Sequence, residues 1–507
     1  MNCNDASRVL AIGIDAAEPS LIEELIARGE MPVLKSLLSE GKWLTVKSPA
    51  HIASGSVWPT FITGEEPVGH GVYGEWAWQP ETMGLRRYSG RYLKPFWKTL
   101  TEKGIRVGMV DVPFAPFIGF TDGFEVCEWG PHDLLEGRTQ SAPQTITDVI
   151  TKETESHPLS LDRLDTAGPR DYQGLNALGS GCLKGVKLRG ELAKRLIAQT
   201  DPHLSVVVFT EIHHSSHYMW HTIAGEHALY QRDTFKNLPA VEPALKDIYL
   251  EVDRQIGELV QIAGADTVLV FSLHGMRPTY GVPAFLDRLL CELGYARFAD
   301  WRTQSWTERA IKLLAVAKRS MPDPLRRLYY KTLPPTTTLR IAQPTMMPAY
   351  DWLHTRVFSM PADQHGWIHV NLLGREVKGT VSPNEYDKTC NEVEQILRSL
   401  VSKDGDRIVR DVFRTAANVD QALTQRLPDL VVHWEDVAFS APLRIQGYAF
   451  ESVPVGRKFT GRHARDGFCI FKGRDGLCEG DILQARDIHR VITQSLFATN
   501  SQELALL

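Results

Sequence analysis

The sequence lacks any uninterrupted apolar run near the roughly 20 residues that a membrane-spanning helix needs. Its first segment, MNCNDASRVLAIGID (1–15), has no basic start and reaches an acidic residue after a short apolar stretch, which is typical of a buried strand and not of a signal peptide. Cysteines are few: the chain has seven, without a Cys-x-x-Cys pair. An odd number of scattered thiols favours a reduced protein, and we expect a cytoplasmic location.

A strong net charge is also missing. The chain has 56 basic and 61 acidic residues, a formal net charge of −5. This balance argues against bulk affinity for nucleic acid, so we expect no nucleic-acid partner. With 507 residues, the chain is long enough for one large α/β domain with insertions or for two to three ordinary domains. Histidine stands out instead, because several of the 17 histidines are clustered.

Several apolar runs alternate with segments of helical period. The runs are RVLAIGID (8–15), GIRVGMVDVPFAP (104–116), HLSVVVFTEIHH (203–214) and ADTVLVFSLHGM (265–276), and GWIHVNL (366–372) and DLVVHW (429–434) are further candidate strands. Continuous runs of Val, Ile, Leu and Phe are typical of strands covered on both faces. The alternation therefore predicts an α/β fold with a mainly parallel, doubly wound sheet sandwiched by helices.

The chain changes in character between about 290 and 355. AIKLLAVAKRSMPDPLRRLYYKTLPPTTTLRIAQP (310–344) is basic, interrupted by prolines and weakly periodic. We expect residues 290–355 to form a basic helical insert, and residues 1–289 and 356–507 to form the two parts of the core. The insert is either a cap over the core or a pair of surface helices that grip a partner, and a merely solvated basic helix face fits the pattern equally well.

Candidate metal ligands follow the predicted strands, where chemistry gathers in parallel sheets. Glu-Ile-His-His-Ser-Ser-His (211–217) supplies Glu211, His213, His214 and His217 directly after an apolar run. If the segment is helical, His213 and His217 lie one turn apart and can share an ion. His463 in GRHARDG offers a third imidazole, although such a histidine alone is more often a surface residue.

A second constellation combines Asp15, at the end of the first predicted strand, with His274 at the end of another. A lone Asp at a strand end is usually a helix cap or a loop residue, so it needs a nucleophile nearby. SPAHIASGSVWPTFITGEEPVGHGVYG (48–74) supplies Ser54 and Ser56 among glycines. A serine hydroxyl must be activated by a base or a metal. No Gly-x-Ser-x-Gly elbow surrounds these serines, which weighs against an α/β-hydrolase triad.

The order of these motifs resembles the alkaline phosphatase superfamily, and within it the branch of type I phosphodiesterases and nucleotide pyrophosphatases with related predicted phosphohydrolases and phosphomutases. The motifs are the strand-end Asp15, Ser54-Gly-Ser-Val-Trp58 with the following Ile-Thr-Gly, Glu211 to His217, Ser-Leu-His-Gly-Met around His274, and the late Gly-Arg-His463. The resemblance covers about residues 8–475 outside the insert. It implies an alkaline phosphatase-like core and a nucleophile at Ser54, with Ser56 as the near miss.

The resemblance also implies two metal ions, often zinc, that flank the nucleophile oxygen. One ion would be held by His213, His217 and His463. The other would be held by Asp15, Ser54 and His274, together with an Asp that precedes this His in the family.

This chain departs from that pattern at two positions. His213 stands where the family usually has Asp, and Leu273 stands where it has the Asp before His274. Leucine cannot ligate a metal. The second site is therefore weak or absent, unless His51, His214, Glu211 or water fills the gap. We expect one or two divalent ions per chain, with zinc favoured and manganese as the alternative.

The function implied by the resemblance is a metal-dependent phosphoester hydrolase, of phosphodiesterase or nucleotide pyrophosphatase type, that acts on a small phosphoester or nucleotide-like molecule through a phosphorylated Ser54. Two alternatives stay open. One is a phosphotransferase in glycan, lipid or natural-product assembly. The other is a catalytically inactive phosphoester-binding relative, in view of Leu273. A homo-oligomer is compatible with the sequence.

Substrate contacts are the least specified part of the sequence. Arg375 offers a bidentate fork for a phosphate, and Asn371 and His365 lie on the same predicted strand and turn. Trp58 offers a ring that could stack on a base or sugar. The plainer interpretations are a solvated arginine and a tryptophan that packs in the core.

Overall fold

The structure of this chain is a computed structural model. It describes residues 6–88, 92–130, 138–159, 172–223, 241–279, 285–300, 346–362, 364–402, 405–436, 459–474 and 476–497, the strands 443–445 and 448–450, and scattered positions from 306 to 343. Within these residues, no helix combines the length and the apolar character needed to cross a membrane.

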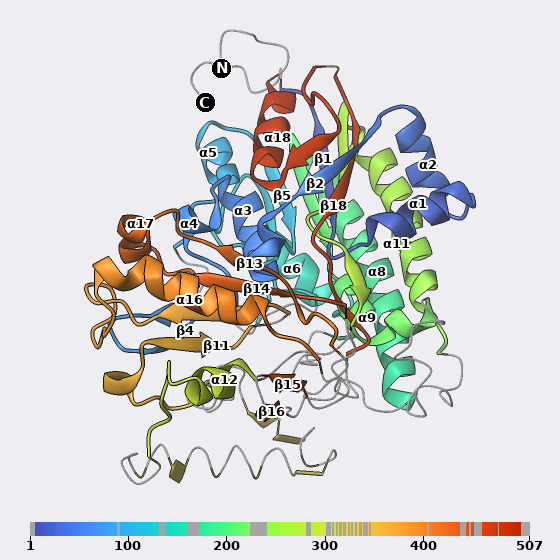
Figure 1. Ribbon diagram of the computed structural model, residues 1–507. Helices are drawn as coiled ribbons and strands as arrows, with labels where there is room; N and C mark the ends of the chain where they lie inside the picture. The colour runs from blue at the N-terminus through green and yellow to red at the C-terminus, as the bar shows by residue number, and fades with distance from the viewer. Residues whose placement is uncertain are drawn as a thin grey trace.

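A nine-stranded sheet forms the centre of the molecule (Figure 1), in the order β19-β2-β18-β9-β1-β8-β5-β6-β7. Its strands are β1 (Val9–Ile14), β2 (Lys42–Lys47), β5 (Val107–Val110), β6 (Gly123–Cys127), β7 (Gln140–Ala142), β8 (Leu204–Phe209), β9 (Thr267–Ser272), β18 (Gly467–Lys472) and β19 (Ile482–Gln484). The five strands from β9 to β6 run parallel, while β18 and β7 pair antiparallel with their neighbours. The predicted α/β fold with a mainly parallel sheet is confirmed.

Helices cover both faces of this sheet because its central strands are apolar on both sides. Leu10 and Ile12 of β1 share a core with α1 (Pro19–Ala27), α2 (Pro32–Ser39), α6 (Gln144–Lys152), α8 (Tyr172–Thr200) and α11 (Leu245–Ala263). Val9 and Ala11 point to the opposite core, formed with α3 (Val57–Thr63), α5 (Phe96–Glu102) and α18 (Ile488–Leu496). Figure 1 shows α8 and α11 to the right of the sheet and α3 and α5 to its left.

A second, antiparallel sheet has the order β11-β12-β14-β13. Its strands are β11 (Val357–Met360), β12 (Gly366–Val370), β13 (Val409–Arg414) and β14 (Leu430–Trp434). It shares a separate core with the hairpin β3 (Trp76–Gln79) and β4 (Gly84–Arg87), with α12 (Leu286–Glu292) and α16 (Tyr386–Arg398), and with α17 (Val419–Thr424).

The second sheet refines the expectation that residues 356–507 as a whole continue the core. The predicted strands at 366–372 and 429–434 exist as β12 and β14, but they belong to the second sheet. Of this part of the chain, β18, β19 and α18 return to the central sheet and its helices. The sequence could not separate the two cases, since a fully buried strand has the same apolar run in either sheet.

The predicted insert at 290–355 lies largely outside the described residues. At its two described ends, Phe298 forms a bridge with Tyr350, and Tyr350 belongs to the core of the second sheet. The shorter elements are η2 (Pro49–His51), η3 (Ser54–Ser56), α4 (Pro67–His70), α9 (Glu211–Met219), η4 (Trp220–Thr222), β10 (Met276–Pro278), η7 (Trp352–His354), η8 (Pro383–Glu385), β15 (Leu443–Ile445), β16 (Tyr448–Phe450), β17 (Gly461–His463) and η9 (Ala485–Asp487).

The parallel strands bring distant segments to one edge of the central sheet. Asp15 follows β1, α9 follows β8, and His274 follows β9, so all three positions lie at the carboxyl edge. Because β18 is antiparallel to β9, its first residue lies at the same edge, and β17 with His463 precedes it. The candidate ligands therefore meet at one end of the sheet.

Candidate functional site

Three histidines converge at the carboxyl edge of the central sheet. His213 and His217 lie one turn apart on α9, and His463 ends β17. The Nε2 atom of His213 is 2.8 Å from Nε2 of His463 and 3.0 Å from Nε2 of His217. The ligating atoms of all three residues lie within 4.8 Å of one another. We call this group the His triad.

A close approach of β17 to α9 brings His463 to the other two histidines. The backbone N–H of Thr460 donates to the carbonyl of His217 at 2.6 Å. A Cβ atom on Gly461 would lie 2.3 Å from the carbonyl oxygen of Ser216, so a larger residue would push the strand away from the helix. On its other side β17 pairs with β10, where Met276 faces His463.

The second ring nitrogens of two members of the His triad, His213 and His217, lie near oxygen atoms. His217 Nδ1 lies 3.2 Å from the carbonyl oxygen of Gly461, and His213 Nδ1 lies 3.0 Å from Asp15 Oδ2. Oxygen partners at Nδ1 favour the tautomer in which the proton is on Nδ1 and the lone pair is on Nε2. The Nε2 atoms of all three histidines lie close together at the centre of the triad.

This donor set fits a divalent metal ion. Three neutral imidazoles are a known ligand set of catalytic zinc, and tetrahedral ligands at the usual Zn–N distance lie about 3.3 Å apart. The 2.8 Å and 3.0 Å separations between Nε2 atoms are close to that value. Converging lone pairs repel one another unless a cation or a proton lies between them, so the arrangement itself calls for positive charge.

Asp15 and His274 form a pair beside the His triad. Asp15 is buried, its Oδ1 accepts a hydrogen bond from Trp58 Nε1 at 2.8 Å, and His274 Nε2 lies 3.9 Å from the same oxygen. Burial, and then the neighbouring His463, lowers the pKa of His274 to about 3 although Asp15 opposes this. His274 is therefore a neutral imidazole at neutral pH.

The turn that carries His274 is fixed by hydrogen bonds. Ser272 Oγ donates to the carbonyl of His274 at 2.7 Å, and the N–H of Met276 donates to Glu18 Oε2 at 3.0 Å. Leu273, in the same turn, is buried and belongs to the apolar core that also contains Trp58. Among the described residues, the His triad is the group of three or more His, Cys, Asp or Glu side chains that lie close enough to hold an ion.

Ser54 begins η3, which leads directly into α3, and it is buried. Trp58 follows one turn later and reaches Asp15, so this end of the helical segment lies at the carboxyl edge of β1. Ser56 Oγ instead donates to the carbonyl of Ala53 at 2.6 Å. The Ser56 hydroxyl is therefore engaged with its own backbone.

The prediction that Glu211 ligates a metal is wrong. Its carboxylate is fully buried and accepts bonds from Arg189 Nε at 2.9 Å and from His157 Nε2 at 2.9 Å. Burial alone would raise its pKa, but Arg189 and then His157 lower it to about 2. Asp111 serves the same network, since Arg189 Nη1 donates to Asp111 Oδ2 at 2.6 Å. The polar residues after β8 and β5 thus anchor the start of α9.

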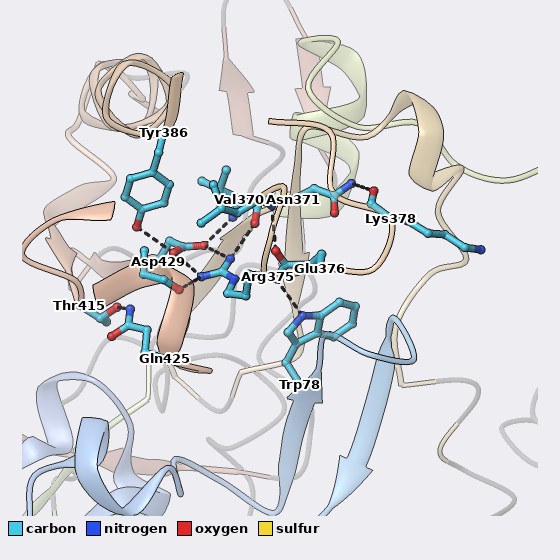
Figure 2. Close-up of polar contacts among 12 residues, drawn as sticks. Trp78, Val370, Asn371, Arg375, Glu376, Lys378, Tyr386, Thr415, Gln425 and Asp429 are labelled. Atoms are coloured by element: carbon cyan, nitrogen blue, oxygen red, sulfur yellow. Dashed lines mark hydrogen bonds and ion pairs between the residues drawn. The ribbon is translucent and has the colours of Figure 1, made fainter. Parts of the chain in front are cut away.

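Arg375 and Asn371 hold the second sheet together and are not placed to bind a substrate phosphate, contrary to the prediction (Figure 2). Arg375 is 3% exposed and donates to both carboxylate oxygens of Asp429, at 2.9 Å and 2.8 Å, and to Glu376 at 2.8 Å. The Asn371 amide donates to the carbonyls of Thr355 and Lys378.

Trp58 and His365 were both predicted to contact the substrate, and the structure argues against this role for Trp58 only. Trp58 is 2% exposed, and its Nε1 donates to Asp15, so its ring is not available to stack on a substrate. His365 lies 3.0 Å from the carbonyl of Ala50 through Nε2 and lines a pocket that also includes His463. His365 therefore stays a candidate for substrate contact.

The sequence reasoning did not select the arginines of this pocket, which are Arg277, Arg410, Arg462 and Arg465. A signal was present, because Arg277 lies three residues after His274, while Arg462 and Arg465 flank His463 in GRHARDG. Because these arginines are close in sequence to two candidate ligand motifs, they lie near one another in the fold when the ligands of the two motifs do.

The sequence profile of the family described as "Type I phosphodiesterase / nucleotide pyrophosphatase" matches residues 9–442. No curated protein sequence matches significantly.

Among solved structures, phosphonoacetate hydrolase from Sinorhizobium meliloti 1021 is similar in its complexes with phosphonoacetate and phosphonoformate. The similarity covers 97% of this chain and 96% of that chain at 14% identity, with TM-scores of 0.52 and 0.51. Murine ectonucleotide pyrophosphatase/phosphodiesterase 5 is also similar, in an inactive variant in complex with AMP. The similarity covers 97% of this chain and 95% of that chain at 11% identity, with a TM-score of 0.43.

At such identities, the likeness to phosphonoacetate hydrolase shows the shared fold. The family profile, in contrast, spans most of the chain, including the segments of Asp15, Ser54, the α9 histidines and His274. The protein belongs to the type I phosphodiesterase/nucleotide pyrophosphatase family of the alkaline phosphatase superfamily, a family of metal-dependent phosphoester hydrolases.

Proposed function

We propose that this protein hydrolyses phosphodiester or pyrophosphate bonds of a small molecule through a phosphorylated Ser54. The observation that carries the proposal is the convergence of the three Nε2 atoms of the His triad. They converge at the sheet edge where Asp15, His274 and the helical segment of Ser54 also lie. Membership in the family supports the class of reaction.

The His triad is the site that would hold a metal ion. Three imidazole nitrogens favour zinc over manganese, which prefers oxygen ligands. A divalent ion bound there supplies positive charge that makes a nearby hydroxyl more acidic and offsets the charge of the phosphoryl oxygens. With Leu273 in place of a ligand, the remaining donors of the second site are Asp15, His274 and the nucleophile Ser54 itself, so we propose one tightly bound ion per chain.

Ser54 has the role of the nucleophile in this proposal. Its Oγ forms a bond to phosphorus while the bond from phosphorus to the leaving oxygen breaks, and the hydroxyl proton passes to solvent. Water then cleaves the Ser54 phosphoester and releases the phosphorylated product. His365 and the arginines of the adjacent pocket face the remainder of the substrate.

A matched pair of variants tests this role of Ser54. Bis(p-nitrophenyl) phosphate reports diester cleavage by the zinc-loaded full chain, and p-nitrophenyl phosphate reports monoester cleavage. Ser54→Ala is expected to lower kcat for the diester by about 1,000-fold or more while the metal content and the melting temperature stay unchanged. Ser56→Ala is expected to keep kcat within about tenfold of the wild type, because Ser56 is engaged with its own backbone.

Two further measurements separate the alternatives. Mass spectrometry of protein quenched during turnover should find phosphate on Ser54, and equal activity of Ser54→Ala would contradict the proposal. A phosphotransferase would instead release nitrophenol in proportion to added alcohol, with little phosphorylated product formed with water. An inactive relative would bind phenylphosphonate equally in the wild type and in Ser54→Ala, and would release no nitrophenol from either substrate.

A further inference from the structure

The pocket beside the His triad is basic. It has an empty volume of about 540 Å³, part of which is open to solvent, and His463 contributes to its wall. Four arginines, together with His365, contribute to the same wall: Arg277, Arg410, Arg462 and Arg465. A group held at the His triad therefore lies next to several guanidinium groups.

Three of the four arginines, each from a different strand, converge on one carboxylate. Arg277 and Arg462 face each other across the β10–β17 pair, and Arg410 lies in β13 of the second sheet. Arg462 forms an ion pair with Asp436. Arg410 Nη2 lies 3.1 Å and Arg277 Nη1 lies 3.7 Å from oxygens of the same carboxylate. Asp436 thus shows that these side chains are arranged to hold an anion.

Among the described residues that line the pocket, four are arginines and none is Asp or Glu. Apart from Asp436, the ion pairs of these arginines in the described part of the chain include one more carboxylate, Glu435, which Arg410 shares with Arg407. Asp466, next to Arg465 in sequence, pairs with Lys47. Arginine stays charged at any physiological pH, so an anion that enters the pocket meets four positively charged side chains.

Arg462 and Arg277 are partly buried, whereas Arg410 and Arg465 are exposed. Arg462 is 8% exposed and the Arg277 side chain is 34% exposed, so water screens their charge less than at an open surface. A planar guanidinium can donate two parallel hydrogen bonds to a carboxylate or a phosphate. An uncharged substrate portion would leave this capacity unused.

We propose that the pocket binds a second anionic group, a carboxylate or a phosphate, of the substrate whose phosphoester is cleaved at the His triad. The inference rests on the proposed function, because the pocket shares His463 with the triad. The substrate class is therefore a phosphoester that carries at least one further anionic group. A diester with neutral groups on both sides fits the pocket poorly.

Calorimetric titration of the zinc-loaded full chain with matched ligands tests this inference. Phenylphosphonate carries the anionic head group alone, and 4-carboxyphenylphosphonate adds a carboxylate to the same ring; neither contains an ester bond. The carboxylated ligand is expected to bind wild-type protein about tenfold or more tightly than phenylphosphonate, because charge-assisted hydrogen bonds to arginine are strong. The advantage should shrink as salt is added.

Arginine variants assign the effect to the pocket. Arg410→Gln and Arg465→Gln change exposed residues, so the fold should be retained, and each should reduce the advantage of the carboxylated ligand severalfold. Arg254→Gln is the matched control, because Arg254 is an exposed arginine of α11 paired with Glu251 and Glu258. It should leave the advantage unchanged.

The outcomes separate this inference from the proposed function. Binding of phenylphosphonate by wild-type protein and its loss in His217→Ala support the site of the proposed function, and no binding of phenylphosphonate contradicts it. Equal affinity for the two ligands, or an advantage that persists in both pocket variants, overturns the inference while the proposed function stands. Benzene-1,4-diphosphonate as a third ligand shows whether a second phosphate-like group gains more affinity than the carboxylate.

Discussion

His213 Nδ1 lies 3.0 Å from Asp15 Oδ2, so the first strand of the sheet supports a histidine whose Nε2 faces the other two imidazoles of the His triad. In the related pattern, an Asp at the position of Asp15 ligates the second ion. Leu273 removes a ligand of the second ion, and His213 gives Asp15 a new partner beside the first.

The contact predicts a role for Asp15 in metal affinity. Asp15→Asn keeps the size of the side chain but removes the negative charge that lies beside His213 Nδ1. The affinity for zinc, measured by competition with a chromophoric chelator, is expected to fall about 10–100-fold. His274→Ala should change this affinity by less than about threefold, because His274 is not part of the triad. An unchanged affinity in Asp15→Asn would show that the contact does not support the metal site.

Leu273→Asp should restore a second ion. The new carboxylate would stand between the end of β9 and His274, and with Asp15 and His274 it completes a set of three donors. Without metal the variant should melt at a lower temperature than the wild type, since a charge replaces a buried leucine near Asp15. Excess zinc should raise the melting temperature and add one ion per chain. A variant that zinc does not stabilise would mean that more than Leu273 separates this site from a two-ion site.

Arg189 is expected to be among the most important residues for stability. It lies fully buried between Asp111 and Glu211, and Arg189→Met leaves both carboxylates buried without their partner. Removing one member of a buried ion pair typically costs about 3–5 kcal/mol of unfolding free energy, measured by urea denaturation. Arg254→Met, which breaks exposed pairs on α11, should cost less than about 1 kcal/mol. Equal losses in the two variants would contradict the assigned role.

The buried carboxyl group of Glu125 is expected to make the free energy of unfolding depend on pH. Burial raises its pKa from 4.5 to about 7, although backbone N–H groups of Gly119 and Ile118 oppose this. Because the pKa of the folded state is raised, the contribution of Glu125 is fully present below pH 4.5 and is lost as the pH rises through about 7. Relative to the wild type, Glu125→Gln should gain up to about 3 kcal/mol of unfolding free energy between pH 4.5 and pH 8.

Urea denaturation of both proteins at several pH values checks this expectation. Glu102→Gln is a suitable control, since Glu102 is exposed on α5 and pairs with Lys98. Parallel pH profiles for the wild type and Glu125→Gln would mean that the buried carboxyl does not titrate in this range.

The central sheet and the position of the metal ligands were predictable from the sequence. The runs that became β1, β8 and β9 are apolar throughout, and residues that follow parallel strands must meet at one edge. Asp15, the α9 histidines and His274 follow from this rule. The rule does not predict His463, because this residue precedes β18, which runs antiparallel to β9. The resemblance to a family was needed to select it.

Other residues could not be assigned because their partners are distant in sequence. Arg375 is of a residue type that binds phosphate, but its guanidinium is paired with Asp429. Glu211 is of a residue type that binds metal ions, but its carboxylate is paired with Arg189. The sequence contains no local sign of these pairs. Likewise, Arg410 joins Arg277 and Arg462 because the second sheet lies against the carboxyl edge, and no periodicity in the sequence determines how the two sheets pack.

The number of zinc ions bound per chain shows whether the His triad is the metal site of this protein. Elemental mass spectrometry of purified protein, equilibrated with excess zinc and then freed of loosely bound ions, should find one zinc per chain. The ion should be lost in His217→Ala and retained in His274→Ala and Ser54→Ala, because the His triad alone holds it. Two ions per wild-type chain, or a single ion that survives in His217→Ala but not in His274→Ala, would contradict the account.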